Sequence, residues 1–288
     1  MPSLRDIRRR ITSVKKTQQI TRAMRMVAGA KLRRAEQAVL AARPYTDQMR
    51  EALAEVARAQ RDAEHPLLVP RAQVRNVEML VVSSDRGLCG AFNANVIKHA
   101  DRLIRAREQA GQGVLISCAG RKAAEFFRRR RGQALRSVHP HDGWVSYASA
   151  AEIAREIAGR YVAGESDEVL LVYNEFVNAL TQKPRELRLL PFAPPAAAGE
   201  AAAALPFEIE PSPAGLLAVL VPKAVEVEVY RALLENQSGE HAARMTAMES
   251  ATRNTEELIS SLTLKFNRAR QAAITKELVE IVSGAEAL

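Results

Sequence analysis

The chain has 288 residues, of which 47% are hydrophobic and 26% charged, an ordinary composition for a soluble protein with a substantial core. No run of 18 apolar residues occurs and the N-terminus lacks the apolar stretch of a signal peptide, so we expect neither a membrane span nor secretion. The two cysteines, Cys89 and Cys118, favour a reducing, cytosolic compartment over a disulfide framework.

The positive charge is concentrated at the start of the chain. Residues 1–50 carry 13 Lys or Arg against three Asp or Glu, so their net charge of +10 accounts for the whole +9 of the protein. Such a basic arm predicts an acidic partner, which can be nucleic acid, an anionic lipid surface or the acidic face of another protein.

A long N-terminal helix is predicted from residue 4 onward. Ser3 followed by Asp6 is a variant of the capping box. Twelve of seventeen positions at alternating spacings of three and four are apolar, which is typical of a coiled-coil seam, although a simple amphipathic helix remains an alternative. The seam runs through Leu4, Ile7, Ile11, Val14, Gln18, Thr21, Arg25, Ala28, Leu32, Ala35, Val39, Ala42, Thr46, Met49, Leu53, Val56 and Gln60.

Three features interrupt this seam. Gln18, Thr21 and Arg25 are consecutive polar positions, which a coil selected only for stability would not contain. Pro44 is expected to bend or break the helix, and His65-Pro66 to end it.

The middle of the chain alternates between strand-like and helical segments. Short apolar runs predict buried strands at 77–83, 113–119 and 168–173, with an edge strand at 186–190. Helical patterns lie between them, at 92–107, 121–131 and 147–162. This alternation predicts parallel βαβ units in a doubly wound, Rossmann-like α/β domain.

A second long helix is predicted at the C-terminus. The low-complexity stretch 193–206 indicates a linker, after which Ser212 and Pro213 start a helix that Pro222 is expected to interrupt. Residues 223–288 contain no proline, and as one helix they would be roughly 100 Å long, too long for a compact domain. Small and polar residues, including Gly239, loosen their apolar seam.

We therefore predict an α/β fold in which the N- and C-terminal helices form a long antiparallel two-helix coiled coil, with a central Rossmann-like domain at the end where both helices enter it. The expected division is an N-terminal helix at 1–65, the α/β domain at 74–192, a linker at 193–211 and a C-terminal helix at 212–288.

Motifs that carry chemistry are weak. Gly87 and Gly90 follow a strand, where phosphate can bind, but the spacing of a dinucleotide fingerprint is missing, so a tight turn is favoured. His139-Pro140-His141 indicates a surface turn rather than a metal site. Cys89 has no histidine near it in sequence to activate it, and the arginine run 128–131 is typical of a solvated face.

Four segments resemble the gamma subunit of F-type ATP synthases, here of bacterial type. They are Ile11–Ala28 (ITSVKKTQQITRAMRMVA), Ser83–Asn93 (SSDRGLCGAFN), Glu235–Met248 (ENQSGEHAARMTAM) and Asn267–Leu278 (NRARQAAITKEL). Together they cover both ends and the centre of the chain.

The resemblance implies a rotor of the central stalk. In this family the helix pair turns inside a ring of three alpha and three beta subunits, while the α/β domain stands with the epsilon subunit on a ring of membrane c subunits. Ion flow turns the c ring and drives ATP synthesis in the beta subunits. The resemblance thus implies a non-catalytic subunit without cofactor, metal or nucleic acid, which is peripheral on the cytoplasmic face of the bacterial plasma membrane and reaches that membrane only through the c ring.

The resemblance also assigns contact residues. Those expected to face the alpha/beta ring are Met24, Arg244, Arg270, Gln271, Thr275 and Glu277. Phe207 and Glu210 are expected at the foot near the c ring. An ordinary seam neighbour is the alternative reading of Met24. The linker has no cysteine, so no thiol switch is expected, and Arg25 adds a charge beside Met24.

Two other hypotheses belong to different classes. The basic arm fits a coiled-coil nucleic-acid-binding protein, whose affinity would fall steeply with salt. The α/β domain fits a dinucleotide-dependent enzyme, which nucleotide would stabilise against unfolding.

Overall fold

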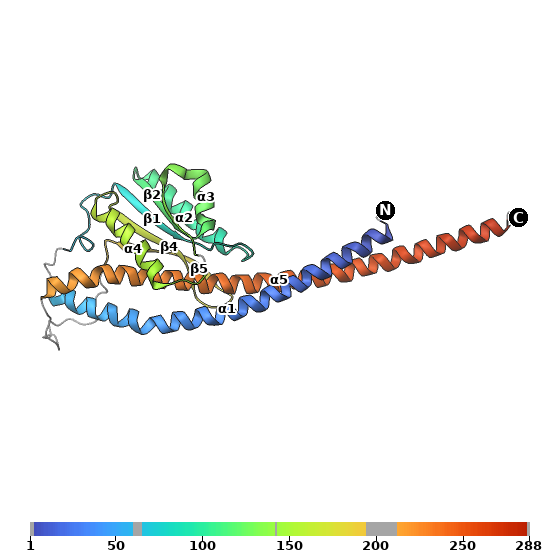
Figure 1. The fold of residues 1–288 in the computed structure, drawn as a ribbon. Helices are drawn as coiled ribbons and strands as arrows, with labels where there is room; N and C mark the ends of the chain where they lie inside the picture. Colours follow the sequence, from blue (N-terminus) through green and yellow to red (C-terminus); the bar gives the residue numbers. More distant parts are fainter. Residues whose placement is uncertain (1–2, 60–64, 142, 194–211, 287–288) are drawn as a thin grey trace. The chain divides into compact units, whose positions relative to one another are not determined.

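The computed structural model describes residues 3–59, 65–141, 143–193 and 212–286 (Figure 1). Two long helices, α1 (Leu4–Ala59) and α5 (Pro213–Glu286), lie at the two ends of the chain. Contacts divide the chain into two compact units, the first formed by 1–29 with 244–288 and the second by 30–243. Each long helix contributes to both units, which are described separately. Among the described residues, no helix is both long and apolar enough to cross a bilayer.

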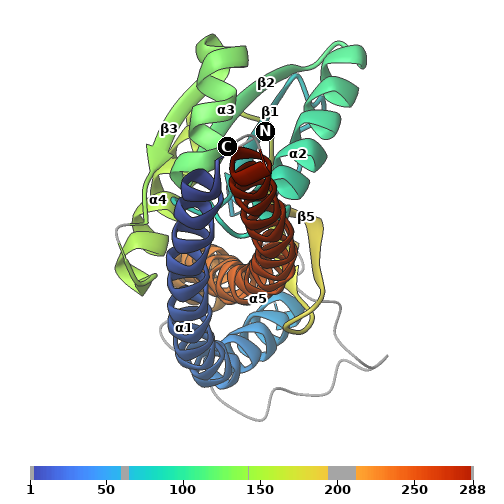
Figure 2. The same cartoon turned by 90° about the vertical axis from the view of Figure 1, so that its right-hand side faces the viewer.

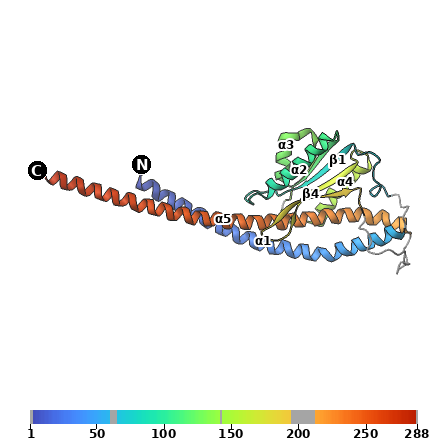
Figure 3. The same ribbon diagram turned by 180° about the vertical axis from the view of Figure 1, so that it is seen from behind.

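In the first unit the start of α1 lies antiparallel to the last part of α5, as Figures 2 and 3 show from two sides. Ser3 caps α1, and its backbone N–H and hydroxyl both donate to the Asp6 carboxylate, as the capping box predicted. The seam is confirmed, because every position of it from residue 4 to residue 28 is buried or half-buried except Arg25. A Cβ at Gly29 would lie 3.4 Å from Met245 Sδ, so the two helices are in close contact there.

The second unit contains a five-stranded sheet with the order β3-β2-β1-β4-β5. Its strands are β1 (Asn76–Val82), β2 (Gly113–Ala119), β3 (Leu135–His139), β4 (Glu168–Phe176) and β5 (Gln182–Leu190). The first four are parallel, whereas β5 pairs antiparallel with β4 at the edge. The connecting helices are α2 (Phe92–Gln109), α3 (Arg121–Arg131, followed by a 3₁₀ turn at Gly132–Ala134) and α4 (Tyr147–Val162).

Apolar side chains of the sheet alternate between two cores. Met79 and Val81 of β1 face α2 and α3. Leu80 and Val82 face the opposite way and pack with α4, the first part of α5 and the end of α1. The period of two is the one expected of strands covered on both faces, so the doubly wound prediction is confirmed.

One polar group interrupts this alternation. Glu78 of β1 is fully buried, and it receives hydrogen bonds from Ser117 Oγ at 2.6 Å and from Arg160 Nε of α4 at 3.1 Å. Burial alone would lower the pKa of Arg160, but hydrogen bonds and charge from Glu78 and Glu156 raise it. Because a buried carboxylate without a partner is costly, this pair ties α4 to the sheet centre in one alignment.

The structure corrects three expectations. Strand β3 was not predicted, because the half-buried stretch 135–139 mixes polar and apolar residues. Pro44 does not break α1 and Pro222 does not interrupt α5. A proline removes one helical hydrogen bond, a cost that packing of the neighbouring turns offsets, as for buried Val221 and Val225 in the core. The end of α1 at His65-Pro66 is not tested, because residues 60–64 lie outside the description.

Candidate functional site

The polar seam positions of α1 meet a matching polar stretch of α5 in the first unit. The Thr21 and Thr252 hydroxyls are 2.8 Å apart and both side chains are buried. One hydroxyl donates to the other, and the accepting hydroxyl donates its own proton to a carbonyl of its own helix, Gln18 O for Thr21 or Met248 O for Thr252. The two hydroxyls can form this hydrogen bond only at one axial offset of the two helices, because its length and direction are restricted. The threonine pair therefore fixes the register of the helix pair.

Charged partners lie on both sides of this threonine pair. Gln18 and Arg22 both donate to Glu256, at 3.1 and 2.6 Å, and Arg25 lies 3.7 Å from Glu249. The ion pairs are about half exposed, so each contributes little to stability. The three polar seam positions are therefore explained by their partners.

Sequence analysis did not identify those partners. Glu249, Thr252 and Glu256 repeat on α5 the spacing of Gln18, Thr21 and Arg25 on α1, with intervals of three and four residues. Because the two helices are antiparallel and polar residues recur in both at the same spacing, that spacing is the signal that would have identified Glu249, Thr252 and Glu256 as the partners.

Met24 and Arg244 lie within this same helix pair. Met24 is half-buried on α1, between the Thr21 contact and the close approach at Gly29. Arg244 is half-buried on α5, next to Met245, which meets Gly29. The structure thus brings both residues to neighbouring turns of one pair, with part of each side chain accessible.

The remaining ring-facing candidates lie further along α5. The side chains of Arg270, Gln271, Thr275 and Glu277 are all exposed. From residue 270 onward every side chain whose exposure is described is exposed, apart from half-buried Ala273. In Figure 1 the C-terminal end of α5 extends past the start of α1 within this unit.

Apolar residues are frequent on this last part of α5. Ile274, Leu278 and Ile281 recur at helical spacing on one face, and Ile281 is 68% exposed. Exposed apolar stripes of this kind mark surfaces that another protein covers. Phe207 and Glu210, expected at the foot, lie outside the described residues.

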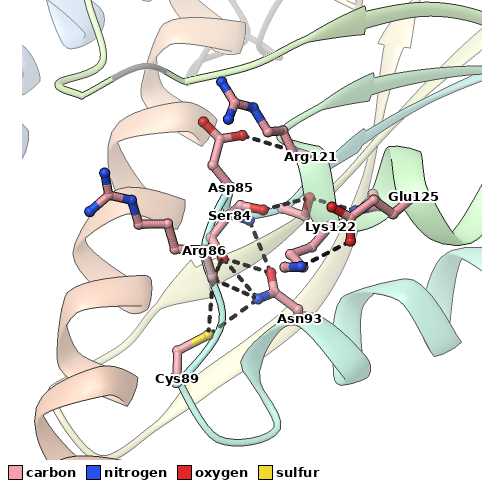
Figure 4. Close-up of polar contacts among 10 residues, drawn as sticks. Ser84, Asp85, Arg86, Cys89, Asn93, Arg121, Lys122 and Glu125 are labelled. Carbon is pink, nitrogen blue, oxygen red and sulfur yellow. Dashed lines mark hydrogen bonds and ion pairs between the residues drawn. The ribbon is translucent and has the colours of Figure 1, made fainter.

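The loop after β1 leads into α2 and also reaches the start of α3, the neighbouring helix that follows β2 (Figure 4). Helix starts at the carboxyl ends of parallel strands are where doubly wound folds bind anions. There the first three backbone amides of α3 bind the chain's own acceptors. These bonds run from Arg121 N to Asp85 Oδ1 at 2.8 Å, from Lys122 N to the Ser84 carbonyl at 3.1 Å, and from Ala123 N to Ser83 Oγ at 2.9 Å.

The loop itself is tied by a second set of bonds. Asn93 of α2 accepts from Ser84 N at 3.0 Å, and Gly90 has a φ of +58°, a left-handed conformation that favours glycine. A phosphate at the start of α3 would have to displace the Asp85 carboxylate. This geometry favours the tight-turn interpretation of Gly87 and Gly90.

The other weak motifs are placed as follows. His139 lies at the end of β3 with Nε2 3.1 Å from Glu156, and among the described residues no group of three or more His, Cys, Asp or Glu is arranged to hold a metal ion. Both cysteines are buried. Burial raises the pKa of the Cys118 thiol to about 12, against a smaller opposing effect of Arg128, so Cys118 is protonated at neutral pH.

Comparison with known proteins agrees with this architecture. A family model described as ATP synthase matches residues 3–288. The ATP synthase gamma chain of an Anaeromyxobacter species is 50% identical over the full length of both chains, and that of Pelotomaculum thermopropionicum is 49% identical over the same share.

Solved structures share the fold at lower identity. A chain of the Euglena gracilis mitochondrial ATP synthase, in its OSCP/F1/c-ring region, superposes with a TM-score of 0.68 at 21% identity, covering 99% of this chain and 94% of that one. A central-stalk chain of the Tetrahymena thermophila enzyme gives 0.62 at 24% identity, covering 81% and 99%. These matches give the nucleic-acid alternative no support. The chain belongs to the ATP synthase gamma-subunit family.

Proposed function

We propose that this protein is the central-stalk rotor of a bacterial ATP synthase. In this assignment it couples ion-driven rotation of a membrane c ring to ATP synthesis and hydrolysis in a ring of three alpha and three beta subunits. Catalysis takes place in the beta subunits, and this chain supplies no catalytic group. It is peripheral on the cytoplasmic face of the plasma membrane and reaches that membrane only through the c ring and the adjoining epsilon subunit.

The observation that carries this proposal is the construction of the helix pair. Its register is fixed internally by the buried Thr21–Thr252 contact, while its outer surface keeps exposed apolar and charged side chains. A shaft must resist sliding of its two helices and still touch its neighbours without adhering at one angle. The exposed apolar stripe of Ile274, Leu278 and Ile281 offers a surface that a surrounding sleeve can contact, and ion pairs formed by exposed charges with that sleeve would each contribute little.

We infer two groups of contact residues from this assignment. Met24, Arg244, Arg270, Gln271, Thr275 and Glu277 face the alpha/beta ring. Phe207 and Glu210 approach the c ring. The exposure of the four residues on the last part of α5 supports the first group, because only accessible side chains can contact a surrounding sleeve.

The first test asks what the chain assembles with. The tagged chain is purified from native membranes and the intact complex is weighed by native mass spectrometry. We expect three alpha and three beta subunits with epsilon and the c ring, and we expect ATP hydrolysis only from the complex. A chain that hydrolyses ATP alone, or that is recovered without alpha and beta subunits, would refute the assignment.

A second test concerns the contact residues. Arg270→Ala is compared with Arg268→Ala, because both arginines are exposed on α5 but two positions apart, so they point to different sides of the helix. We expect Arg270→Ala to lower ATP turnover of the assembled complex while Arg268→Ala leaves it near the wild-type rate. Equal turnover in the two variants would remove Arg270 from the contact set.

A further inference from the structure

A single aromatic residue connects both long helices with the sheet domain inside the second unit. Trp144, the only tryptophan of the chain, lies between β3 and α4 and is 38% exposed. The guanidinium carbon of Arg34, on α1, lies 4.3 Å from the centre of its ring. On α5, the ring of His241 lies 5.9 Å from that of Trp144, edge to face at 67°.

The same loop has a second attachment to α5. Gln237 Nε2 donates to the Gly143 carbonyl at 3.1 Å, and Gln237 lies one turn before His241 on the same side of the helix. Gly143 has a φ of +127°, a conformation that residues with a side chain rarely adopt. Glycine at position 143 therefore allows the loop to place the Gly143 carbonyl and the next residue, Trp144, against α5.

These contacts differ in kind from the apolar packing of the interface. On α5 they act together with Tyr147 of α4, whose hydroxyl donates to Glu226 at 2.7 Å and whose ring meets that of Tyr230 edge to face. Residues such as Leu53 of α1 and Val221 of α5 pack in the apolar core, and apolar burial has no preferred direction. A guanidinium over an indole face, an edge-to-face ring pair and a hydrogen bond all depend on orientation. Rotation of either helix about its axis would break them.

We propose that Trp144 is a positioning residue that fixes the rotational setting of the helix segments 30–59 and 213–243 on the sheet domain, and so carries turning force between that domain and the helices. The inference rests on the proposed rotor function and extends it, because it names one contact, shared by both long helices, through which the foot turns the shaft. Arg34 and His241 are the two groups that the indole engages.

The first experiment tests the contact itself in the full chain. Acrylamide quenching of Trp144 fluorescence is measured in the wild type, in Arg34→Gln and in the control Arg33→Gln, whose side chain is exposed one position away on α1. Because the guanidinium covers one of the two ring faces, Arg34→Gln should raise the quenching constant roughly twofold, with no change in the control. An unchanged constant in Arg34→Gln would overturn the proposed contact.

The second experiment tests its role in the assembled enzyme. Inverted membrane vesicles are energised with ATP, and ion uptake, followed with pH- and sodium-sensitive dyes, is divided by the rate of ATP hydrolysis. We expect Trp144→Ala and Arg34→Gln to lower this ratio while ATP hydrolysis continues. Trp144→Phe should give a ratio between those of Trp144→Ala and the wild type, because phenylalanine keeps a ring face for the cation. Arg33→Gln should match the wild type.

The outcomes separate this inference from the proposed function. If Trp144→Ala keeps the wild-type ratio of ion uptake to ATP hydrolysis, the inference is overturned. If Trp144→Ala does not assemble, the same result in Arg34→Gln overturns it. Either result leaves the rotor assignment intact. Failure of the wild-type chain to support ATP-driven ion uptake in these vesicles would instead refute the rotor assignment.

Discussion

Gly239 lies in the interior of α5 at a point where the helix touches the edge of the sheet domain. A Cβ built at this glycine would lie 2.9 Å from Phe92 Cε2 and 3.2 Å from Gln182 Cγ. Gly159 of α4 is its natural control, because it is also helical but its Cβ would meet nothing within 4 Å. Both residues belong to the second unit.

The expected energies follow from two opposing effects. Replacing an interior helical glycine by alanine stabilises a helix by about 1 kcal/mol, and Gly159→Ala should show that gain. At Gly239 the same gain is opposed by crowding against the buried Phe92 ring, which costs about 2 kcal/mol when the neighbours must shift. Gly239→Ala is therefore expected to destabilise the unit by about 1 kcal/mol, some 2 kcal/mol below Gly159→Ala.

Urea unfolding followed by Trp144 fluorescence measures this difference, because the single tryptophan reports on the unit that contains both glycines. The two variants are compared with the wild type at equal concentration, and the slopes with urea should be unchanged. A Gly239→Ala variant as stable as Gly159→Ala would refute the reasoning, since it would mean that α5 does not approach α2 as closely as described.

Three further outcomes are expected. Thr21→Val removes the hydroxyl contact with Thr252 and should lower the stability of the helix pair by about 1 kcal/mol in thermal unfolding followed by circular dichroism. Burial raises the pKa of Glu235 against the charge of Arg231, and Glu175 adds a smaller effect in the same direction as burial. The free energy of unfolding should therefore fall as pH rises above 4.5, the ordinary value for Glu. Glu235→Gln should make that fall smaller in urea unfolding measured at several pH values. Cys118 should resist alkylation at pH 8 until the chain is unfolded, as peptide mass spectrometry will show.

Two of these have a control variant. Gln18→Ala removes an exposed hydrogen bond from the same seam and should cost less than Thr21→Val. Glu165→Gln removes an exposed carboxylate of the same unit and is the control for Glu235→Gln. Equal effects within either pair, or ready alkylation of Cys118 in the folded chain, would contradict the explanation given.

The sequence predicted the elements whose pattern is set by burial. The seam of α1 and the apolar strands β1, β2 and β4 were found, because a side chain that must be buried leaves a period of 3.5 or 2 in the sequence. Strand β3 was missed, because at the sheet edge residues such as Arg136 are exposed and the alternation is weak. The prediction that Pro44 breaks the helix was wrong, because the energetic cost of one proline is small compared with the packing energy of a 56-residue helix.

The residues proposed to contact the ring are a different case. Arg270, Gln271 and Thr275 are exposed, so no packing requirement within this chain determines them, and only the resemblance to a family points to them. By contrast, Thr252 and Glu256 were within reach of physical reasoning, since polar residues in a seam need partners at the matching positions of the other helix.

Asp85, which accepts from the first backbone amide of α3, has a consequence for how this helix end responds to free anions. A domain that bound ATP or ADP at this helix end would become more or less stable as the concentrations of those metabolites changed. Here the carboxylate of Asp85, which belongs to the chain itself, accepts from the Arg121 amide at the start of α3. A free phosphate would have to displace this tethered carboxylate, so we expect the stability of the start of α3 to change little with nucleotide concentration.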